Sequence, residues 1–250
     1  MTQRSFDSEI LPSLCDPDTR NSFEPYSGSL RNPVSGRVYP VREGIPLFVS
    51  TVSGSNLKMQ SHYDRVARFY DLTEGFKSRF GSGVAPRKLA VEALDVKSGM
   101  RMLDVGIGTG RCVPHIPRGV EICGIDLSIA MLRQCARNLR RMRRPAHLFQ
   151  AVAERLPFCP EVFDRVLNVG GIGKFNDPLR AVREMTWVVR PGGKIVIVDQ
   201  LEGASASTEA GANPAEQLIP LVPAEMVEIN ATMLDNAGWF CLSFRKPHNS

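Results

Sequence analysis

Three glycines at alternate positions follow a short apolar stretch that contains an acid. Residues 102–110 read Met-Leu-Asp-Val-Gly-Ile-Gly-Thr-Gly. A strand that runs into a glycine-rich turn builds ligand sites in open parallel sheets, because glycine tolerates φ > 0 and lets the backbone approach a ligand. Asp104 would repel a pyrophosphate but hold an ammonium group or a ribose hydroxyl. The dinucleotide fingerprint would also need a glycine where the chain has Arg111. We therefore predict a cradle for a cationic nucleoside.

A second acid supports this interpretation. Residues 120–125 read as another apolar strand, and Asp126 follows directly. The offset from Asp104 is close to the separation of about 20 residues at which an acid meets ribose hydroxyls in nucleoside-binding βαβ units. Asp126 is therefore the predicted ribose ligand.

Composition limits the class of protein. The chain has 250 residues, 43% of them hydrophobic, and a formal net charge of +5. These values suit one α/β domain of ordinary size with a modest extra segment. No window approaches the ~18 consecutive apolar residues of a membrane span, and the polar N-terminus predicts no secretion signal. Six cysteines without a C-x-x-C pair favour buried free thiols in a reducing compartment, so we expect a cytoplasmic protein.

Six arginines gather between residues 133 and 144. We expect a solvated helix end there, where arginines also complement the helix dipole. Peripheral contact with an anionic membrane surface stays open. Nucleic acid is disfavoured as a partner, because the basic residues are confined to this one end and no nucleic-acid motif accompanies them.

The elements that position the glycine turn alternate between strands and helices after residue 100. The pattern predicts strands over 102–105, 120–125, 147–152, 163–169 and 194–198, and helices over 128–139 and 177–189. Such alternation implies a Rossmann-like, doubly wound, mostly parallel α/β sheet with helices on both faces. Upstream, we expect a linker over 50–60, a helix from 57 and a second helix over 85–94. Downstream, we expect a long loop or lid over 202–223, a helix over 223–237 and a sixth strand over 239–244.

With these motifs in order, residues 57–245 resemble the class I S-adenosylmethionine-dependent methyltransferases. Within that class they are similar to the ubiquinone/menaquinone C-methyltransferases and other small-molecule enzymes. Besides the two acidic turns, the resemblance rests on Tyr-Asp pairs at 63 and 70, Ala-Glu-Arg-Leu-Pro-Phe at 153–158, Phe-Asp-Arg-Val at 163–166, and Val-Arg-Pro-Gly-Gly-Lys at 189–194. The sheet of this fold normally ends in an antiparallel hairpin with a seventh strand. Few residues follow the sixth strand, so we expect the seventh to be absent.

The resemblance implies S-adenosylmethionine as cofactor and assigns its ligands. They would be Tyr63, Tyr70, Asp104, Gly106, Gly108, Gly110, Asp126, Leu127, Met131, Ala153, Glu154, Asn168 and Val169. Asp104 and the glycine backbone would meet the methionine end, and Asp126 the ribose. The chain departs from the family at Val152, where an acid usually accepts a hydrogen bond from the adenine amino group.

The N-terminal segment resembles a small zinc-ribbon module without its cysteines. Its Tyr-Pro at 39–40 and Gly-Ile-Pro at 44–46 carry the likeness, and its composition is that of turns and hairpins. The two metal knuckles would fall at residues 15–18 and 32–35, where one cysteine remains, so we predict no metal. The predicted organisation is a ribbon-like segment over 1–55, a helical lid over 56–100 and a cofactor-binding core over 101–250.

Methyl transfer from a sulfonium needs alignment and exclusion of water more than it needs a catalytic triad. If the acceptor requires a base, His62, Tyr63, His115 and Lys174 are candidates near the predicted mouth of the site; each also fits a structural or solvated role. We expect a small quinone-like or natural-product aromatic acceptor. Two other hypotheses stay open: an S-adenosylmethionine-binding enzyme that cyclises or transfers another group, and a non-catalytic partner protein. A homodimer also stays open.

Overall fold

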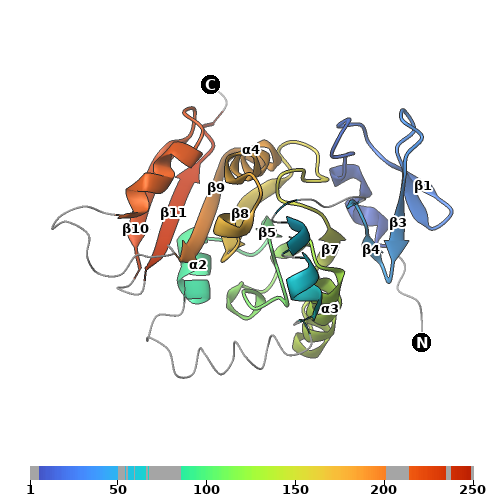
Figure 1. Cartoon of the computed structure of the whole chain (residues 1–250), viewed down its shortest axis with the longest axis horizontal. Coiled ribbons are helices and arrows are strands. Elements are labelled where there is room, and N and C mark those ends of the chain that lie inside the picture. Colours follow the sequence, from blue (N-terminus) through green and yellow to red (C-terminus); the bar gives the residue numbers. More distant parts are fainter. Residues whose placement is uncertain are drawn as a thin grey trace.

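A computed structural model gives the fold, and it describes residues 6–49, 54, 56–58, 60–65, 67, 86–200, 214–234 and 238–248. A seven-stranded sheet in the order β10-β11-β9-β8-β5-β6-β7 forms its centre (Figure 1). Strands β5 to β9 run parallel, whereas β10 and β11 are antiparallel to their neighbours. The strands are β5 (Arg101–Val105), β6 (Glu121–Asp126), β7 (His147–Gln150), β8 (Phe163–Val169), β9 (Val189–Gln200), β10 (Val227–Met233) and β11 (Trp239–Arg245). The predicted doubly wound, mostly parallel sheet is confirmed.

Helices cover both faces of the sheet, which splits the apolar core in two (Figure 1). On one face lie α2 (Pro86–Leu94), the short η2 (Val113–His115) and α3 (Ile129–Met142). On the other lie η3 (Ile172–Lys174), α4 (Pro178–Val188) and η4 (Pro214–Leu221). Alternate residues of β5 show the division, because Met102 packs into the first core and Leu103 into the second. None of the described helices is long and apolar enough to cross a membrane.

The C-terminal edge differs from the sequence prediction. The predicted helix over 223–237 is wrong, because β10 occupies this stretch and pairs antiparallel with β11. The predicted absence of a seventh strand is wrong for the same reason: the hairpin partner of β11 precedes it in the chain. β9 also begins earlier than residue 194, because Val189 already pairs with Phe163 of β8.

The linker predicted over 50–60 is also shorter. Residues 54, 56–58, 60–65 and 67 are helical, and we call them the lid helix. The helix starts early because the backbone N–H of Asn56 donates to Oδ1 of Asn176, 3.1 Å away. An amide of the first helical turn, which has no acceptor within the helix, thus donates to a residue far away in the chain. Of the long loop or lid predicted over 202–223, residues 214–221 form η4, and residues 202–213 lie outside the described residues.

The N-terminal segment folds as a small module with its own antiparallel sheet. Residues 6–49, which we call the N-terminal module, contain η1 (Ser8–Ser13), β1 (Glu24–Tyr26), β2 (Ser29–Arg31), β3 (Val38–Arg42) and β4 (Ile45–Pro46). The strands pair in the order β1-β2-β3-β4. Three aromatic rings, Phe23, Tyr39 and Phe48, pack with centroids 5.2–5.4 Å apart.

Hydrogen bonds occupy the place where the resemblance would put zinc. Oδ1 of Asp16 accepts the amides of Asp18 and Thr19 at 2.8 and 3.0 Å. The Asn32 oxygen accepts the two amides that follow in its own turn, and its Nδ2 donates to Oγ1 of Thr19 at 2.6 Å. Tyr39 closes the network by donating to Oδ2 of Asp16 at 2.9 Å. Within the described residues, no group of three or more His, Cys, Asp or Glu could hold a metal ion.

Replacing Asp16 tests this network. Asp16→Ala leaves the Tyr39 hydroxyl and two amides without their acceptor, and we expect the free energy of unfolding to fall by about 3 kcal/mol. Burial acts to raise the pKa of Asp16, but hydrogen bonds from Asn32, two amides and Tyr39 outweigh it and lower that pKa below 3.8. Its contribution to stability is therefore present above pH 3.8 and is lost as pH falls through the folded-state pKa.

Urea unfolding monitored by circular dichroism measures the effect. Glu24→Ala is the control, because Glu24 pairs with Arg31 at the surface of the same module. Such an exposed pair contributes at most about 1 kcal/mol. Equal losses for the two variants would contradict the assigned role of Asp16.

Candidate functional site

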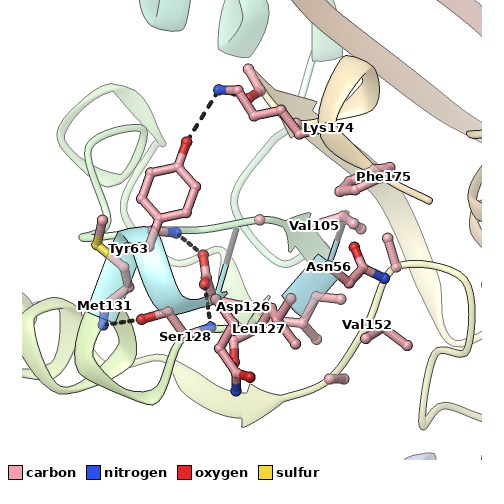
Figure 2. A pocket seen from close by; sticks show the side chains of 18 of the residues that line it. Asn56, Tyr63, Val105, Asp126, Leu127, Ser128, Met131, Val152, Lys174 and Phe175 are labelled. Atoms are coloured by element: carbon pink, nitrogen blue, oxygen red, sulfur yellow. Dashed lines mark hydrogen bonds between the residues drawn. The ribbon is translucent and has the colours of Figure 1, made fainter. Parts of the chain in front are cut away.

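A cavity opens at the carboxyl ends of β5, β6 and β8, beneath the lid helix (Figure 2). It encloses about 770 Å³, including the part that opens to solvent. The residues that line it are Asn56, Gln60, Tyr63, Val105, Gly106, Gly108, Ile125, Asp126, Leu127, Ser128, Met131, Ala151, Val152, Ala153, Val169, Gly170, Gly171, Lys174 and Phe175. Its position is the one at which open α/β sheets bind ligands.

The glycine turn forms the floor on the β5 side. Gly106, Gly108 and Gly110 have φ of 81°, 56° and 82°, a region that glycine enters without strain. The amides of Gly106 and Ile107 both donate to the Ile125 carbonyl at 2.9 Å, which fixes the turn to β6. The turn is thus held before any ligand arrives.

Asp126 connects the glycine turn to helix α3. Its carboxylate accepts the Gly108 amide at 3.0 Å and the Ser128 amide at 2.8 Å. The Ser128 hydroxyl in turn caps α3 by accepting the Met131 amide at 3.1 Å. Burial raises the pKa of Asp126 to about 6, partly offset by these amides, and Asp64 raises it further. A ribose that donates hydroxyl hydrogen bonds would stabilise the ionised form.

Two buried polar atoms beneath the turn lack partners within the described residues. They are Oδ2 of Asp104 and Oδ1 of Asn168. Asp104 is 1% exposed and Asn168 is fully buried, and the Asn168 amide group donates to the Val105 carbonyl at 2.6 Å. Burial, followed by the charge of Asp126, raises the pKa of Asp104 to about 7. An ammonium group held at this turn would favour the ionised form of Asp104 through its charge.

The lid helix covers the cavity through polar contacts. Asp64 accepts a hydrogen bond from the Ser128 hydroxyl, and Gln60 donates to the Leu127 carbonyl at 3.4 Å. Figure 2 shows Tyr63 of the lid helix and Lys174 of η3 pointing toward each other. The Lys174 ammonium donates to the Tyr63 hydroxyl at 3.2 Å and to the Gly170 carbonyl at 3.0 Å. Both side chains of this pair line the cavity.

The structure brings most of the predicted residues together. Nine line the cavity: Tyr63, Gly106, Gly108, Asp126, Leu127, Met131, Ala153, Val169 and Lys174. Asp104, Gly110 and Asn168 lie behind the lining residues, and Tyr70 lies outside the described residues. His62 and His115 are exposed and do not line the cavity, so the candidate bases that face it are Tyr63 and Lys174.

Glu154 occupies a different place from the adenine edge to which the resemblance assigns it. It is 7% exposed and does not line the cavity. Its carboxylate accepts the Asn56 side-chain amide at 3.2 Å and the backbone amides of Asn176 and Asp177 at 2.8 and 3.4 Å. Glu154 therefore ties the start of the lid helix to the loop before α4.

Asn56 and Gln60 are the functional residues that sequence reasoning missed. Their signal was present, because residues 56, 60, 63, 64 and 67 recur at helical spacing and so share one face. The serines and glycine just upstream suggested a linker instead.

Comparisons with known proteins identify the family. A methyltransferase domain model matches residues 103–197. Demethylmenaquinone methyltransferase of Renibacterium salmoninarum is 36% identical over 139 residues, which is 55% of this chain and 56% of that protein. Phosphatidylethanolamine N-methyltransferase of Cereibacter sphaeroides is 33% identical over 139 residues, or 54% of this chain and 68% of that protein. The chain belongs to the class I S-adenosylmethionine-dependent methyltransferases.

The similarity is limited in the length that it covers and in sequence identity. The chain spans little more than half the length of the demethylmenaquinone methyltransferases that it matches. Among solved structures, the [4+2]-cyclase SpnF superposes with a TM-score of 0.65 at 20% identity, over 80% of this chain and 99% of that one. That likeness shows the shared fold. S-adenosylmethionine is the cofactor of the family. Asp126 lines the cavity, and Oδ2 of Asp104 is buried without a partner among the described residues.

The two buried acids predict a pH dependence for cofactor binding by this methyltransferase. Because the folded-state pKa of Asp104 is raised from 3.8 to about 7, ionising it lowers the stability of the ligand-free protein as pH rises through that range. An ammonium ligand favours the ionised form. We therefore expect affinity for S-adenosylhomocysteine to rise by up to about tenfold per pH unit below pH ~6 and to level off above pH ~7.

Calorimetric titration of S-adenosylhomocysteine across this pH range measures the effect. Asp104→Asn should weaken binding by about 10- to 100-fold, the worth of a hydrogen bond to a charged group, and flatten the profile near pH ~7. Asp95→Asn, which alters an exposed pair with Lys97, is the control. A profile unchanged in Asp104→Asn would contradict the assignment.

Proposed function

We propose that the chain transfers the methyl group of S-adenosylmethionine to a small organic acceptor, with a quinone-like or other flat aromatic compound favoured. The observation that carries the proposal is the mixed lining of one cavity. Asp126 and the glycine turn line it together with apolar side chains and the Tyr63–Lys174 pair. The former suit the cofactor of the family, and the latter suit a flat acceptor that carries a hydroxyl.

Small residues make room for the acceptor. Gly170 and Gly171 follow β8, and a Cβ added at Gly171 would come within 2.6 Å of the Asn168 amide group and 3.1 Å of the Phe175 ring. Backbone alone therefore passes between Phe175 and the cavity floor. A flat ring could stack against the exposed face of Phe175 with little steric cost.

The residues of this chain would act by holding and orienting. When bound, S-adenosylmethionine supplies a methyl group already activated on its sulfonium. Asp104 and Asp126 would fix the two ends of the cofactor, while the lid helix excludes water from the space between. If the acceptor carries a hydroxyl, the Lys174 ammonium would stabilise its oxyanion, and Tyr63 would hold Lys174 toward the cavity.

A mass-resolved methylation assay tests this function. The purified chain is incubated with S-adenosylmethionine and one acceptor at a time. The acceptors are a reduced naphthoquinone that lacks its ring methyl group, a simple catechol, and ethanolamine phospholipid vesicles. We expect S-adenosylhomocysteine and a product heavier by one CH₂ with an aromatic acceptor, and neither product with Asp126→Ala. Methylation of the phospholipid alone would overturn the aromatic acceptor.

A non-methylating reaction is the second candidate, because SpnF, a [4+2]-cyclase, shares the fold and Val152 lines the cavity where the family usually has an acid. It predicts tight cofactor binding and a product of unchanged mass. The same assay separates the two, since only methyl transfer consumes S-adenosylmethionine in proportion to product.

The arginine-rich end of α3 supports neither a nucleic acid nor a membrane role for the cavity. Ser128 at the start of α3 lines the cavity, whereas Arg140 and Arg141 lie in its last turn. A helix of 14 residues is about 20 Å long. A surface bound by these arginines would therefore lie away from the cavity mouth. Peripheral membrane contact and a homodimer remain predictions.

Lys174→Met tests the role of Lys174 toward the acceptor separately from cofactor binding. Removing the ammonium should lower kcat by on the order of 100-fold with a hydroxylated acceptor. The KM for S-adenosylmethionine should stay within a factor of about two, because Lys174 is not assigned to the cofactor. Lys88→Met, which alters an exposed pair on α2, is the control. A kcat equal to that of wild type would contradict the role of Lys174.

A further inference from the structure

The wall of the cavity opposite the glycine turn has no regular secondary structure of its own. Residues 150–159, which we call the wall segment, connect β7 toward β8 and contain only isolated bridges and turns after Gln150. Ala151, Val152 and Ala153 of this segment line the cavity. Without a helix or strand to fix it, the shape of the wall depends on tertiary contacts.

Those contacts come largely from the N-terminal module, which lies against the β7 edge of the sheet (Figure 1). The Phe48 amide donates to the Gln150 carbonyl at 2.8 Å, where Leu47 forms a parallel bridge. Farther along, the Cys15 amide donates to the Pro157 carbonyl at 3.2 Å, and the Cys159 amide donates to the Ser13 carbonyl at 3.0 Å. The module thus bonds to the backbone of the wall at both ends.

Arg20 holds the middle of the wall. Its guanidinium donates to the Leu156 carbonyl at 3.1 Å and forms an ion pair with Glu184 of α4. Glu184, which is 8% exposed, also accepts the Leu156 amide at 2.8 Å. Both polar groups of Leu156 are therefore held by one Arg20–Glu184 pair. Asp18 of the module adds a contact to Arg155 at 2.7 Å.

Side-chain packing connects the contacts between the N-terminal module and the wall segment to the cavity. The Phe158 ring packs edge-on against Phe149 and Phe163, with centroids 5.2 and 4.9 Å apart, and Phe48 of the module lies 6.5 Å from Phe149. Gln150 reaches across to donate to the Leu127 carbonyl at 3.0 Å. Leu127 itself lines the cavity. Module, wall and cofactor side are thus one packed unit.

We propose that the N-terminal module is a positioning element of the cofactor site, with Arg20 as the residue that sets the wall Ala151–Val152–Ala153 at the distance at which it contacts the nucleoside. The inference depends on one part of the proposed function, which is binding of the cofactor. It requires no methyl transfer and no particular acceptor.

Arg20→Ala is the main test, and the readout is the Kd for S-adenosylhomocysteine measured by calorimetry on the full chain. We expect a weakening on the order of tenfold, the size of coupling carried by residues that do not touch the ligand. Arg20→Lys, which keeps the charge but not the forked geometry, should recover part of the loss. Arg31→Ala is the matched control, because Arg31 pairs with Glu24 and stacks on Tyr26 within the module. It should leave the Kd within about a factor of two.

Amide hydrogen exchange gives a second readout that a general loss of stability would not mimic. Arg20→Ala should speed exchange at Leu156 and Cys159 while leaving the β5 and β8 amides protected, since only the wall loses its partner. With methyl transfer under way, the KM for S-adenosylmethionine should rise and kcat at saturation should stay near that of wild type.

Each outcome decides the proposal. A folded Arg20→Ala protein with unchanged Kd, or an equal loss in Arg31→Ala, overturns it. If Arg20→Ala does not fold, Asp18→Ala replaces it, since Asp18 is half-exposed; unchanged Kd and unchanged exchange at Arg155 and Leu156 then overturn the proposal.

If the wild type binds S-adenosylhomocysteine but methylates nothing, the proposed function fails while this inference stands. If the wild type does not bind it, the inference fails as well.

Discussion

The carboxylate of Asp126 is the interaction on which the rest of the site depends. It accepts the amides of Gly108 and Ser128, so one side chain closes both strand-to-helix turns at the carboxyl edge of the sheet. Ser128 then caps α3 and also donates to Asp64 of the lid helix. A single buried carboxylate thus couples the glycine turn, the helix that follows β6 and the cover of the cavity. Parallel β5 and β6 must stay in register for this to hold, and their five paired positions provide that register.

This arrangement buries two negative charges, and the charge of Arg87 offsets the raised pKa of Asp104 only in part. Asp104 and Asp126 are both buried, and the pKa of each is raised first by that burial. A protein selected for stability alone would place apolar or paired groups here. The unsatisfied Asp104 oxygen and the raised pKa values are therefore signs of a ligand-binding role. Burial of these two carboxylates lowers the stability of the protein without a ligand and favours a ligand with a cationic end and hydroxyl donors.

Much of this was predictable from sequence because the cofactor end is built from local patterns. A strand, an acid and spaced glycines specify the turn within ten residues, and the alternation of strands and helices specifies the sheet. The β10 edge was missed although Val227, Ile229, Ala231 and Met233 alternate in the manner of a strand. Val227 and Ile229 are exposed and Ala231 and Met233 are half-buried, and pairing with β11 decides the conformation of the strand. The contacts of Asn56 and Glu154 were not predicted for a related reason, since they join residues that lie far apart in the chain.

The N-terminal module holds its turns together through side-chain hydrogen bonds. In the ribbons that it resembles, cysteine thiolates from two turns meet at zinc; here the side chains of Asp16 and Asn32 each order their own turn by accepting the next amides. Thr19 and Tyr39 then join the two turns through hydrogen bonds. Such a network is weaker than metal ligation and needs a dry surrounding. Packing of Phe48 toward Phe149 of the main sheet provides that surrounding. Burying the module against the methyltransferase core therefore stabilises the module and shapes the core in the same contact.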